Sequence, residues 1–183
     1  SPVLTNSQFK KFKKFFSKKV KIIDCTFDIK NSLKDRIEAI REEAETSVRE
    51  GSTCLILSDK NISNQRASIP SILTVGGIHS HLVRQGLRGY CSLNVECSDA
   101  MDTHSFAVLI GVGATTINPY LAIDGIFQRY EKKLFGKSDY ESCVKKFKKS
   151  IDAGLLKIMS KMGISVISSY RGGCNFEAVG LSR

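Results

Sequence analysis

Apolar and polar residues follow one another along this chain in two alternating patterns. Short runs of β-branched and aliphatic residues, bounded by polar residues, have the composition of buried strands. Between these runs, apolar residues recur every three or four positions, as they do on one face of a helix. The runs predict strands at 20–25, 53–57, 90–97 and 114–118, and the helical spacing predicts helices at 8–16, 32–49, 70–84, 103–111, 120–135 and 139–162.

The residues after the last long helix predict one further strand and one further helix. Gly163 is placed to end the long helix in a left-handed conformation. Residues 164–167 are mostly β-branched and predict a fifth strand, which delivers the polar residues 168–171 to its carboxyl end. Residues 175–179 predict a short helix after a pair of glycines. The chain is therefore expected to end in a helix, a strand, a loop and a helix.

The alternation of strands and helices predicts an α/β fold. About five strands joined by helices and short loops favour a mostly parallel sheet with helices packed on it. We expect this sheet to be either open and doubly wound or part of a barrel. We also expect a single domain over 1–183, in which 1–19 form an appended N-terminal loop and helix and 20–183 form the α/β core.

Polar residues stand where four of the predicted strands end. They are Asp24, Asp59, Glu96 and Asn118. Because the carboxyl ends of parallel strands meet at one edge of a sheet, these side chains are expected to converge there. Carboxylates in that position can bind cations or act in acid–base catalysis. They can equally cap helices and hold loops, and the sequence leaves both interpretations open.

A second candidate site lies near the end of the chain and consists of Lys161, Tyr170 and Arg171. Arg171 is the best anion ligand of the three, because its planar guanidinium binds a carboxylate or a phosphate through two parallel hydrogen bonds. It could instead tie the last loop to an internal carboxylate. Lys157 and Lys161 lie four residues apart on one helix face, where lysines are more often solvated.

Other motifs carry weaker signals. The sequence 111–114, GVGA, is not a phosphate loop, because a helix ends there and a strand follows, which is the reverse of the required order. Gly113 is more simply a helix cap. The six cysteines include no closely spaced pair and are expected to be reduced and mostly buried. Cys174, near the start of the last predicted helix, has no evident histidine partner for a reactive role.

The formal net charge is +10, and much of it comes from lysine runs at 10–19 and 145–149. Both runs are typical of the solvated faces of amphipathic helices, with Phe9, Phe12, Phe15 and Phe16 beneath the first of them. No nucleic-acid-binding motif accompanies the charge, so we expect no nucleic-acid partner. No apolar run is long enough to span a bilayer, and we expect no membrane partner.

Seven segments in a fixed order identify a family. They are SPVLTN at 1–6, LILSD at 55–59, IPSIL at 69–73, INPYLA at 117–122, GLLKIMSKMGIS at 154–165, SYRG at 169–172 and FEAVGL at 176–181. Together they resemble the central domain of glutamate synthase, nearly from end to end. The chain departs from the usual pattern of that family at Lys60, where arginine is usual, at Val112, where tyrosine is usual, and at 173–175. These departures argue against a strict ligand site at those positions.

The resemblance implies a role inside a longer enzyme. Glutamate synthases convert glutamine and 2-oxoglutarate to two glutamates, with electrons from a nicotinamide cofactor or ferredoxin. The central domain implies two partners in the same chain, a preceding amidotransferase domain and a following domain that holds FMN and an iron–sulfur cluster. By resemblance it shapes the tunnel that carries ammonia between them, with no catalytic, cofactor-binding or metal-binding residue of its own.

The resemblance also implies an intracellular protein, in the cytoplasm or a plastid, and leaves open the electron donor and whether the longer enzyme is oligomeric. Two rival functions remain at this point. The chain could be a separate anion-binding α/β domain or enzyme that uses Arg171 and Lys161, or an electrostatic binder of nucleic acid through its lysine runs.

Overall fold

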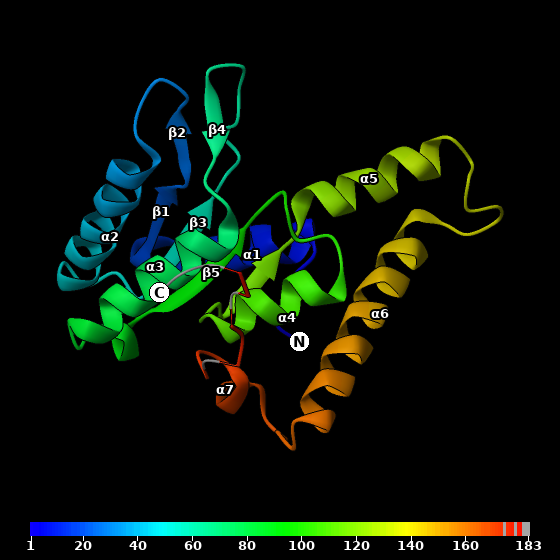
Figure 1. The fold of residues 1–183 in the computed structure, drawn as a ribbon. Helices are drawn as coiled ribbons and strands as arrows, with labels where there is room; N and C mark the ends of the chain where they lie inside the picture. Colours follow the sequence, from blue (N-terminus) through cyan, green and yellow to red (C-terminus); the bar gives the residue numbers. More distant parts are fainter. Residues whose placement is uncertain (174, 178, 181–183) are drawn as a thin grey trace.

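The computed structural model describes residues 1–173, 175–177 and 179–180, and a parallel sheet of four strands lies at its centre (Figure 1). The strands lie in the order β1 (Val20–Asp24), β3 (Cys54–Ser58), β5 (Ser92–Glu96) and β6 (Thr116–Asn118). Each strand pairs in parallel with the next. The α/β class is therefore confirmed. The order follows the chain in one direction and never reverses, which matches the partial-barrel alternative, although the sheet does not close.

Three helices that connect these strands cover one face of the sheet. They are α2 (Leu33–Arg49), α3 (Ser71–Arg84) and α4 (Thr103–Gly111). Right-handed crossovers that all step in the same direction place their helices on the same face. Leu55 and Leu57 of β3 point to that face and lie in the main hydrophobic core, together with Ile40, Ile78 and Ile110 from the three helices.

The opposite face of the sheet is covered by α1 (Asn6–Phe16). Side chains alternate along a strand, so Cys54 and Ile56 of β3 point to this face and pack with Phe9 in a second, smaller core. The continuous apolar run at 53–57 is thereby explained, since β3 is covered on both faces. Phe15, which we expected beneath the lysines, is 82% exposed, because only Phe9, Phe12 and Phe16 have the spacing of one helix face.

The first residues of the chain add a short extension to the sheet. Val3 forms a parallel bridge with Ile117 of β6. The Leu4 amide donates to the Ile117 carbonyl over 2.9 Å, and the Ile117 amide donates to the Pro2 carbonyl over 2.8 Å. The outer edge of β6 is therefore occupied by the N-terminal segment.

Two short strands lie outside the main sheet and were not predicted. β2 (Thr26–Asp28) and β4 (Arg66–Ser68) pair antiparallel and project beyond the carboxyl ends of β1 and β3 (Figure 1). Each is only three residues long, so neither produces a strand-like run of apolar residues.

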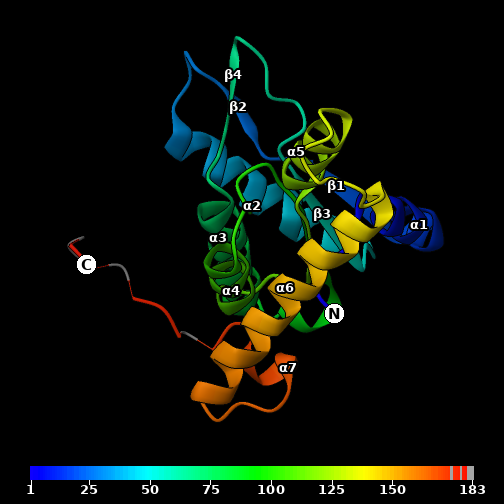
Figure 2. The ribbon, with the colours of Figure 1, turned by 90° about the vertical axis from the view of Figure 1, so that its right-hand side faces the viewer.

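The helices α5 (Tyr120–Glu131) and α6 (Tyr140–Lys161) form an arm beside the sheet (Figure 2). The far half of α6 reaches the main core through Ile151, Leu155 and Met159. Gly154 permits this approach, because a Cβ atom at that position would lie 2.4 Å from Thr103 Cγ2 at the start of α4. Gly163, with φ of 69°, follows the end of α6 as predicted.

The predicted fifth strand at 164–167 is wrong. Residues 164–166 form no strand, and α7 (Ile167–Tyr170) follows directly. The buried or partly buried residues here are Ile164, Ile167 and Tyr170, a spacing of three that suits a helical turn and not the alternation of a strand. In addition, the outer edge of β6 already carries the N-terminal segment.

The last predicted helix, at 175–179, is also wrong for the residues that the structure describes. Residues 175–177 have no regular secondary structure, and Val179 lies in a turn. Phe176 explains part of this difference, because its ring packs on α4 at Gly111, where a Cβ atom would lie 2.5 Å from the ring. Cys174 and its weighed reactive role lie outside the described residues.

Candidate functional site

The parallel register brings three of the predicted strand-end residues to one edge of the sheet. Asp24 is level with Ser58, Ser58 with Glu96, and Glu96 with Asn118. Asp59 follows Ser58 directly. We call this row the carboxyl edge. The convergence expected from the sequence is therefore present, and the partners of each side chain determine what the row can do.

Glu96 is the most tightly bound carboxylate of the carboxyl edge, and only 3% of it is exposed. Lys13 Nζ of α1 lies 2.9 Å from each of its two oxygens, and Lys60 Nζ lies 3.0 Å from Oε1. Ser58 Oγ donates to Oε2 over 2.8 Å. Burial tends to raise the pKa of Glu96, but the hydrogen bonds from Lys13, Lys60 and Ser58 outweigh burial and lower it. Glu96 is thus an ionised anchor for α1.

Asp59 holds the loops that follow β3 and β5. Its Oδ2 accepts hydrogen bonds from the Ser98 amide at 2.9 Å and the Ser98 hydroxyl at 2.6 Å, with the Ser68 hydroxyl at 3.4 Å. Oδ1 is buried and has no hydrogen-bond donor within the described part of the chain. Burial, followed by the proximity of Asp59, raises the pKa of Tyr120. Tyr120 is therefore neutral at the start of α5.

Asp24 holds the β2–β4 pair to the main sheet. Its Oδ1 accepts from the amide and hydroxyl of Thr26 at 2.9 Å and 2.7 Å. Its Oδ2 accepts from Asn61 Nδ2 at 3.1 Å and pairs with Arg66 at 3.0 Å. Partial burial tends to raise the pKa of Asp24, but these hydrogen bonds and the Arg66 charge lower it. Both oxygens are thereby committed to structural contacts.

Asn118 closes the row on the side of the N-terminus. Its Nδ2 donates to the Leu4 carbonyl at 3.0 Å and to Asn6 Oδ1 at 2.9 Å, and the residue is 1% exposed. The carboxyl edge thus joins α1, the β2–β4 pair and the N-terminal segment to the sheet. This arrangement supports the structural interpretation of these residues over acid–base catalysis.

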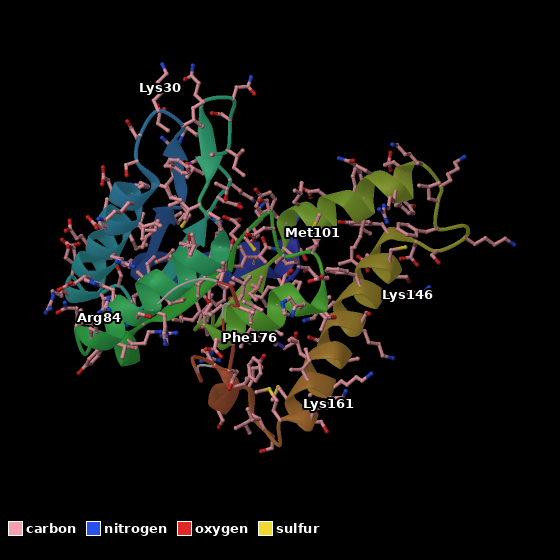
Figure 3. The ribbon with its side chains drawn as sticks, in the orientation of Figure 1. Lys30, Arg84, Met101, Lys146, Lys161 and Phe176 are labelled. Atoms are coloured by element: carbon pink, nitrogen blue, oxygen red, sulfur yellow. The ribbon has the colours of Figure 1, made fainter. Side chains whose placement is uncertain are left out.

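The second candidate set, Lys161, Tyr170 and Arg171, is not brought together as one site. Tyr170 is fully buried, its hydroxyl donates to the Ala107 carbonyl at 3.2 Å, and burial raises its pKa. Lys161 is exposed in the last turn of α6 (Figure 3) and forms neither a hydrogen bond nor an ion pair with any described residue. Tyr170 is a core residue that fixes α7 against α4.

Arg171 lies beside two residues that the sequence analysis did not select, His79 and Arg88. The Arg171 charge contributes to lowering the pKa of Arg88, after the larger effect of burial. Arg88 Nε donates to His79 Nδ1 over 3.0 Å. The residues come from α3, from the turn before β5 and from the end of α7, and no short motif links them. Sequence spacing therefore gave no signal for this cluster.

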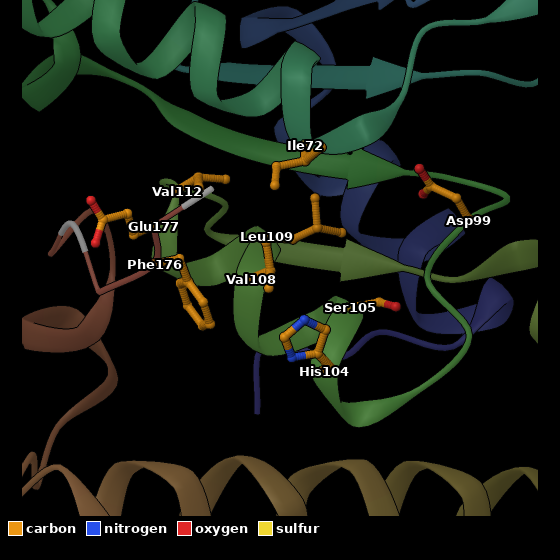
Figure 4. A pocket seen from close by; sticks show the side chains of 9 residues that line it. All are labelled: Ile72, Asp99, His104, Ser105, Val108, Leu109, Val112, Phe176 and Glu177. Carbon is orange, nitrogen blue, oxygen red and sulfur yellow. The ribbon is translucent and has the colours of Figure 1, made fainter. Parts of the chain in front are cut away.

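A cleft of about 590 Å³ lies between α3, α4 and the end of the described chain (Figure 4). Its lining is Ile72, Asp99, His104, Ser105, Val108, Leu109, Val112, Phe176 and Glu177. Asp99 accepts from the Ser71 amide at 2.9 Å at the start of α3, and Ser105 donates to Asp102 at 2.7 Å. His104 packs edge-on against Phe176. The walls are mainly apolar, and Asp99 and Ser105 take part in helix caps.

The cysteines of the described chain are buried thiols. Cys25, Cys54, Cys91, Cys97 and Cys143 are free and buried, as predicted. Burial, and then the nearby Asp24 charge, raise the pKa of Cys25 to about 12. Within 1–173, 175–177 and 179–180, no group of three or more His, Cys, Asp or Glu residues is placed to hold a metal ion. None of the helices in the described residues has the length and hydropathy of a membrane span.

Comparison with known proteins gives a consistent result over the whole chain. A family model described as glutamate synthase central domain matches residues 1–182. The chain is 52% identical over 186 residues to the glutamate synthase (NADPH) large chain of Azospirillum brasilense and 44% identical over 189 residues to that of Bacillus subtilis. It is 39% identical over 198 residues to the chloroplastic ferredoxin-dependent glutamate synthase of Spinacia oleracea. Each match covers 100% of this chain but only 12% of the relative.

Proposed function

This chain belongs to the family of glutamate synthase central domains, and on that premise we propose that it connects the catalytic domains of a longer glutamate synthase chain. The observation that carries this proposal is that the whole of this chain matches only about an eighth of the length of each relative. The proposed whole enzyme converts glutamine and 2-oxoglutarate to two glutamates, and residues 1–183 act as a single non-catalytic domain within it.

The carboxyl edge supports a scaffold role. Its carboxylates are ionised or buried and are held by lysines, serines and backbone amides of this same chain. A general base needs a free position within hydrogen-bond reach of a substrate proton. At Asp24 and Glu96 these positions are filled by structural donors, so the proposal assigns catalysis to the flanking domains.

The physical task of such a domain is to keep ammonia away from water. The amidotransferase reaction releases ammonia from glutamine, and the second reaction adds it to 2-oxoglutarate. In neutral water ammonia is mostly protonated and is no longer a nucleophile. We propose that the packed body of this domain forms part of the wall of the tunnel between the two reactions. A wall with buried apolar cores on both faces of the sheet suits this purpose.

Cofactors and compartment follow from the same premise. The relatives are named for NADPH or for ferredoxin as electron donors, and we propose that a donor of one of these kinds serves the longer enzyme. From the resemblance to glutamate synthases, FMN and an iron–sulfur cluster are proposed to lie in a following domain of the longer chain. An intracellular location, in the cytoplasm or a plastid, fits a set of bacterial and chloroplastic relatives.

A chimera tests the proposal directly. The matched segment of the Azospirillum brasilense large chain would be replaced by residues 1–183, and glutamate formed per glutamine consumed would be measured. We expect two glutamates per glutamine, as in the unmodified enzyme, because ammonia is still transferred inside the protein. A folded, flavin-containing chimera that uses added ammonia normally but yields one glutamate per glutamine would contradict the tunnel role.

The 183-residue chain by itself provides the complementary measurement. It should release no ammonia from glutamine and show no flavin absorbance after purification. Flavin that copurifies in stoichiometric amount, or glutaminase activity that follows the protein through gel filtration, would show that this domain holds chemistry of its own.

A further inference from the structure

Two arginines, Arg88 and Arg171, lie near each other at the amino ends of the strands, and neither pairs with a carboxylate among the described residues. Arg88, in a short 3₁₀ helix (Arg88–Tyr90) before β5, donates to the carbonyls of Cys91 at 2.6 Å and Gly113 at 2.8 Å, and to His79 Nδ1 at 3.0 Å. All three acceptors are neutral groups. They fix the guanidinium in place, and no described carboxylate pairs with its positive charge.

Arg171 is the second cation of this cluster. Its Nε is buried and has no acceptor among the residues that the structure describes. None of the ion pairs between described residues includes Arg88 or Arg171. A buried N–H group without an acceptor is rare in proteins and costs stability, so its presence calls for an explanation. The alternative in which Arg171 binds an internal carboxylate is not observed in the described residues.

His79 holds the two arginines near each other. Its ring lies between two glycines with positive φ, Gly113 and Gly172, where Cβ atoms would approach ring atoms within 2.4 Å and 2.8 Å. Gly172 directly follows Arg171, and Arg88 binds the Nδ1 atom of the same ring. Burial and the Arg88 charge lower the pKa of His79, which keeps the imidazole neutral. Both arginine residues remain partly exposed, although the Nε atom of Arg171 is itself buried.

We propose that Arg88 and Arg171 form a binding site for an oxyanion, either a phosphate or a carboxylate. Arg171 offers Nε and a terminal nitrogen as a fork, the geometry in which guanidinium binds such groups. Arg88 has three of its five N–H groups bound by described residues and supplies the second charge from a fixed position. The site needs neither Lys161 nor Tyr170, and it does not depend on the assignment to glutamate synthase.

Inorganic phosphate is the first probe. The unfolding of the 183-residue chain would be measured at increasing phosphate, with sodium chloride adjusted to keep the ionic strength constant. Phosphate at about ten times its Kd should lower the unfolding equilibrium constant about 11-fold. Arg171→Gln should abolish this effect, and Arg171→Lys should retain part of it, because it keeps the charge but loses the fork.

Arg84→Gln is the matched control. Arg84 is exposed in the last turn of α3 (Figure 3) and takes part in no ion pair with described residues, so its loss should leave the phosphate effect unchanged. The Nε–H signal of Arg171 in a ¹⁵N spectrum, assigned by its absence in Arg171→Gln, should move as phosphate saturates. Equal phosphate effects on wild type and Arg171→Gln, or an Nε–H signal that does not move, would overturn the proposal.

A second arm distinguishes a dissolved anion from a carboxylate supplied by another part of the longer protein. The same titration would be made with acetate, and phosphate would then be tested on the Azospirillum brasilense chimera. Arg171-dependent phosphate binding in both the short chain and the chimera would identify a dissolved anion. Binding in the short chain alone, with acetate also effective, would identify a protein carboxylate that fills the site in the longer chain.

Discussion

The two edges of the central sheet carry charges in opposite ways. At the carboxyl edge, Glu96 is surrounded by two lysines and a serine of the same chain. At the amino edge, Arg88 and Arg171 lie around a neutral histidine, and neither forms an ion pair with a described residue. Polar residues at strand ends therefore need not mark a ligand site. Among the described residues, Arg88 and Arg171 form no ion pair and lie at the other end of the strands.

The topology explains the difference. Ligand sites of open α/β sheets usually lie beyond the carboxyl ends of the strands, where the strand order reverses. The order β1-β3-β5-β6 has no such reversal. The carboxyl edge is instead tied to the β2–β4 pair, to α1 and to the N-terminal segment, each through one residue of the row. The polar side chains of this edge therefore bind other parts of the domain, at positions where a substrate would bind in an open site.

The largest predicted effect concerns the amino edge. Gly113→Ala should destabilise the chain by about 3 kcal/mol, since alanine is strained at a φ of 123° and its Cβ would collide with the His79 ring. Gly51→Ala is the control, because φ there is 97° but no atom lies within 4 Å of the added Cβ. It should cost only about 1 kcal/mol. Urea unfolding of both variants would measure the difference, and equal losses would show that His79 moves aside without cost.

The second predicted effect concerns the carboxyl edge. Glu96→Gln should destabilise the chain by about 2 kcal/mol at pH 7, because it removes a buried acceptor of charge-assisted hydrogen bonds from Lys13 and Lys60. Ser98→Ala, which leaves the Glu96 contacts intact, serves as a comparison for loss of a neighbouring hydrogen bond to Asp59.

The pH dependence of this effect has a definite sign. The pKa of folded Glu96 is lower than the ordinary value of 4.5, so ionised Glu96 contributes its full stability above about pH 4.5. That contribution is lost as the pH falls through the folded pKa. The difference in free energy of unfolding between wild type and Glu96→Gln should therefore be constant from pH 7 to about pH 5 and shrink at lower pH. A difference that grows on acidification would contradict the ion-pair assignment.

The sequence predicted which residues form the carboxyl edge, but it did not predict their hydrogen-bond partners. Apolar runs located the four strands, and parallel pairing then required Asp24, Glu96 and Asn118 to meet. Their partners were unpredictable, because Lys13 lies 83 residues from Glu96 in the chain and no spacing rule connects them. The β2–β4 pair was missed for a different reason, because three-residue strands have no apolar periodicity to detect.

The errors at the end of the chain have a different cause. Ile164–Ile167 has the composition of a strand, yet burial there follows a spacing of three, from Ile164 to Tyr170. Composition alone could not show that β6 already pairs with Val3. The sequence named Arg171 as a candidate anion ligand, but its neighbours His79 and Arg88 come from distant segments. Local patterns therefore predicted the elements, whereas the charge cluster depended on their packing.

The smallest predicted effect separates the two edges by their response to salt. Arg171→Gln should stabilise the chain by about 0.5 kcal/mol at low ionic strength, because it removes the repulsion from Arg88. At 1 M sodium chloride the Debye length falls to about 3 Å, and this advantage should nearly disappear. Lys60 is a 51% exposed ion-pair partner of Glu96. Lys60→Gln should therefore change the free energy of unfolding in the opposite direction and destabilise the chain most at low salt. Urea unfolding at both salt concentrations measures the change in free energy of unfolding for each of the two variants. A loss of stability in Arg171→Gln at low salt would mean that Arg171 pairs with a negative charge within the chain itself.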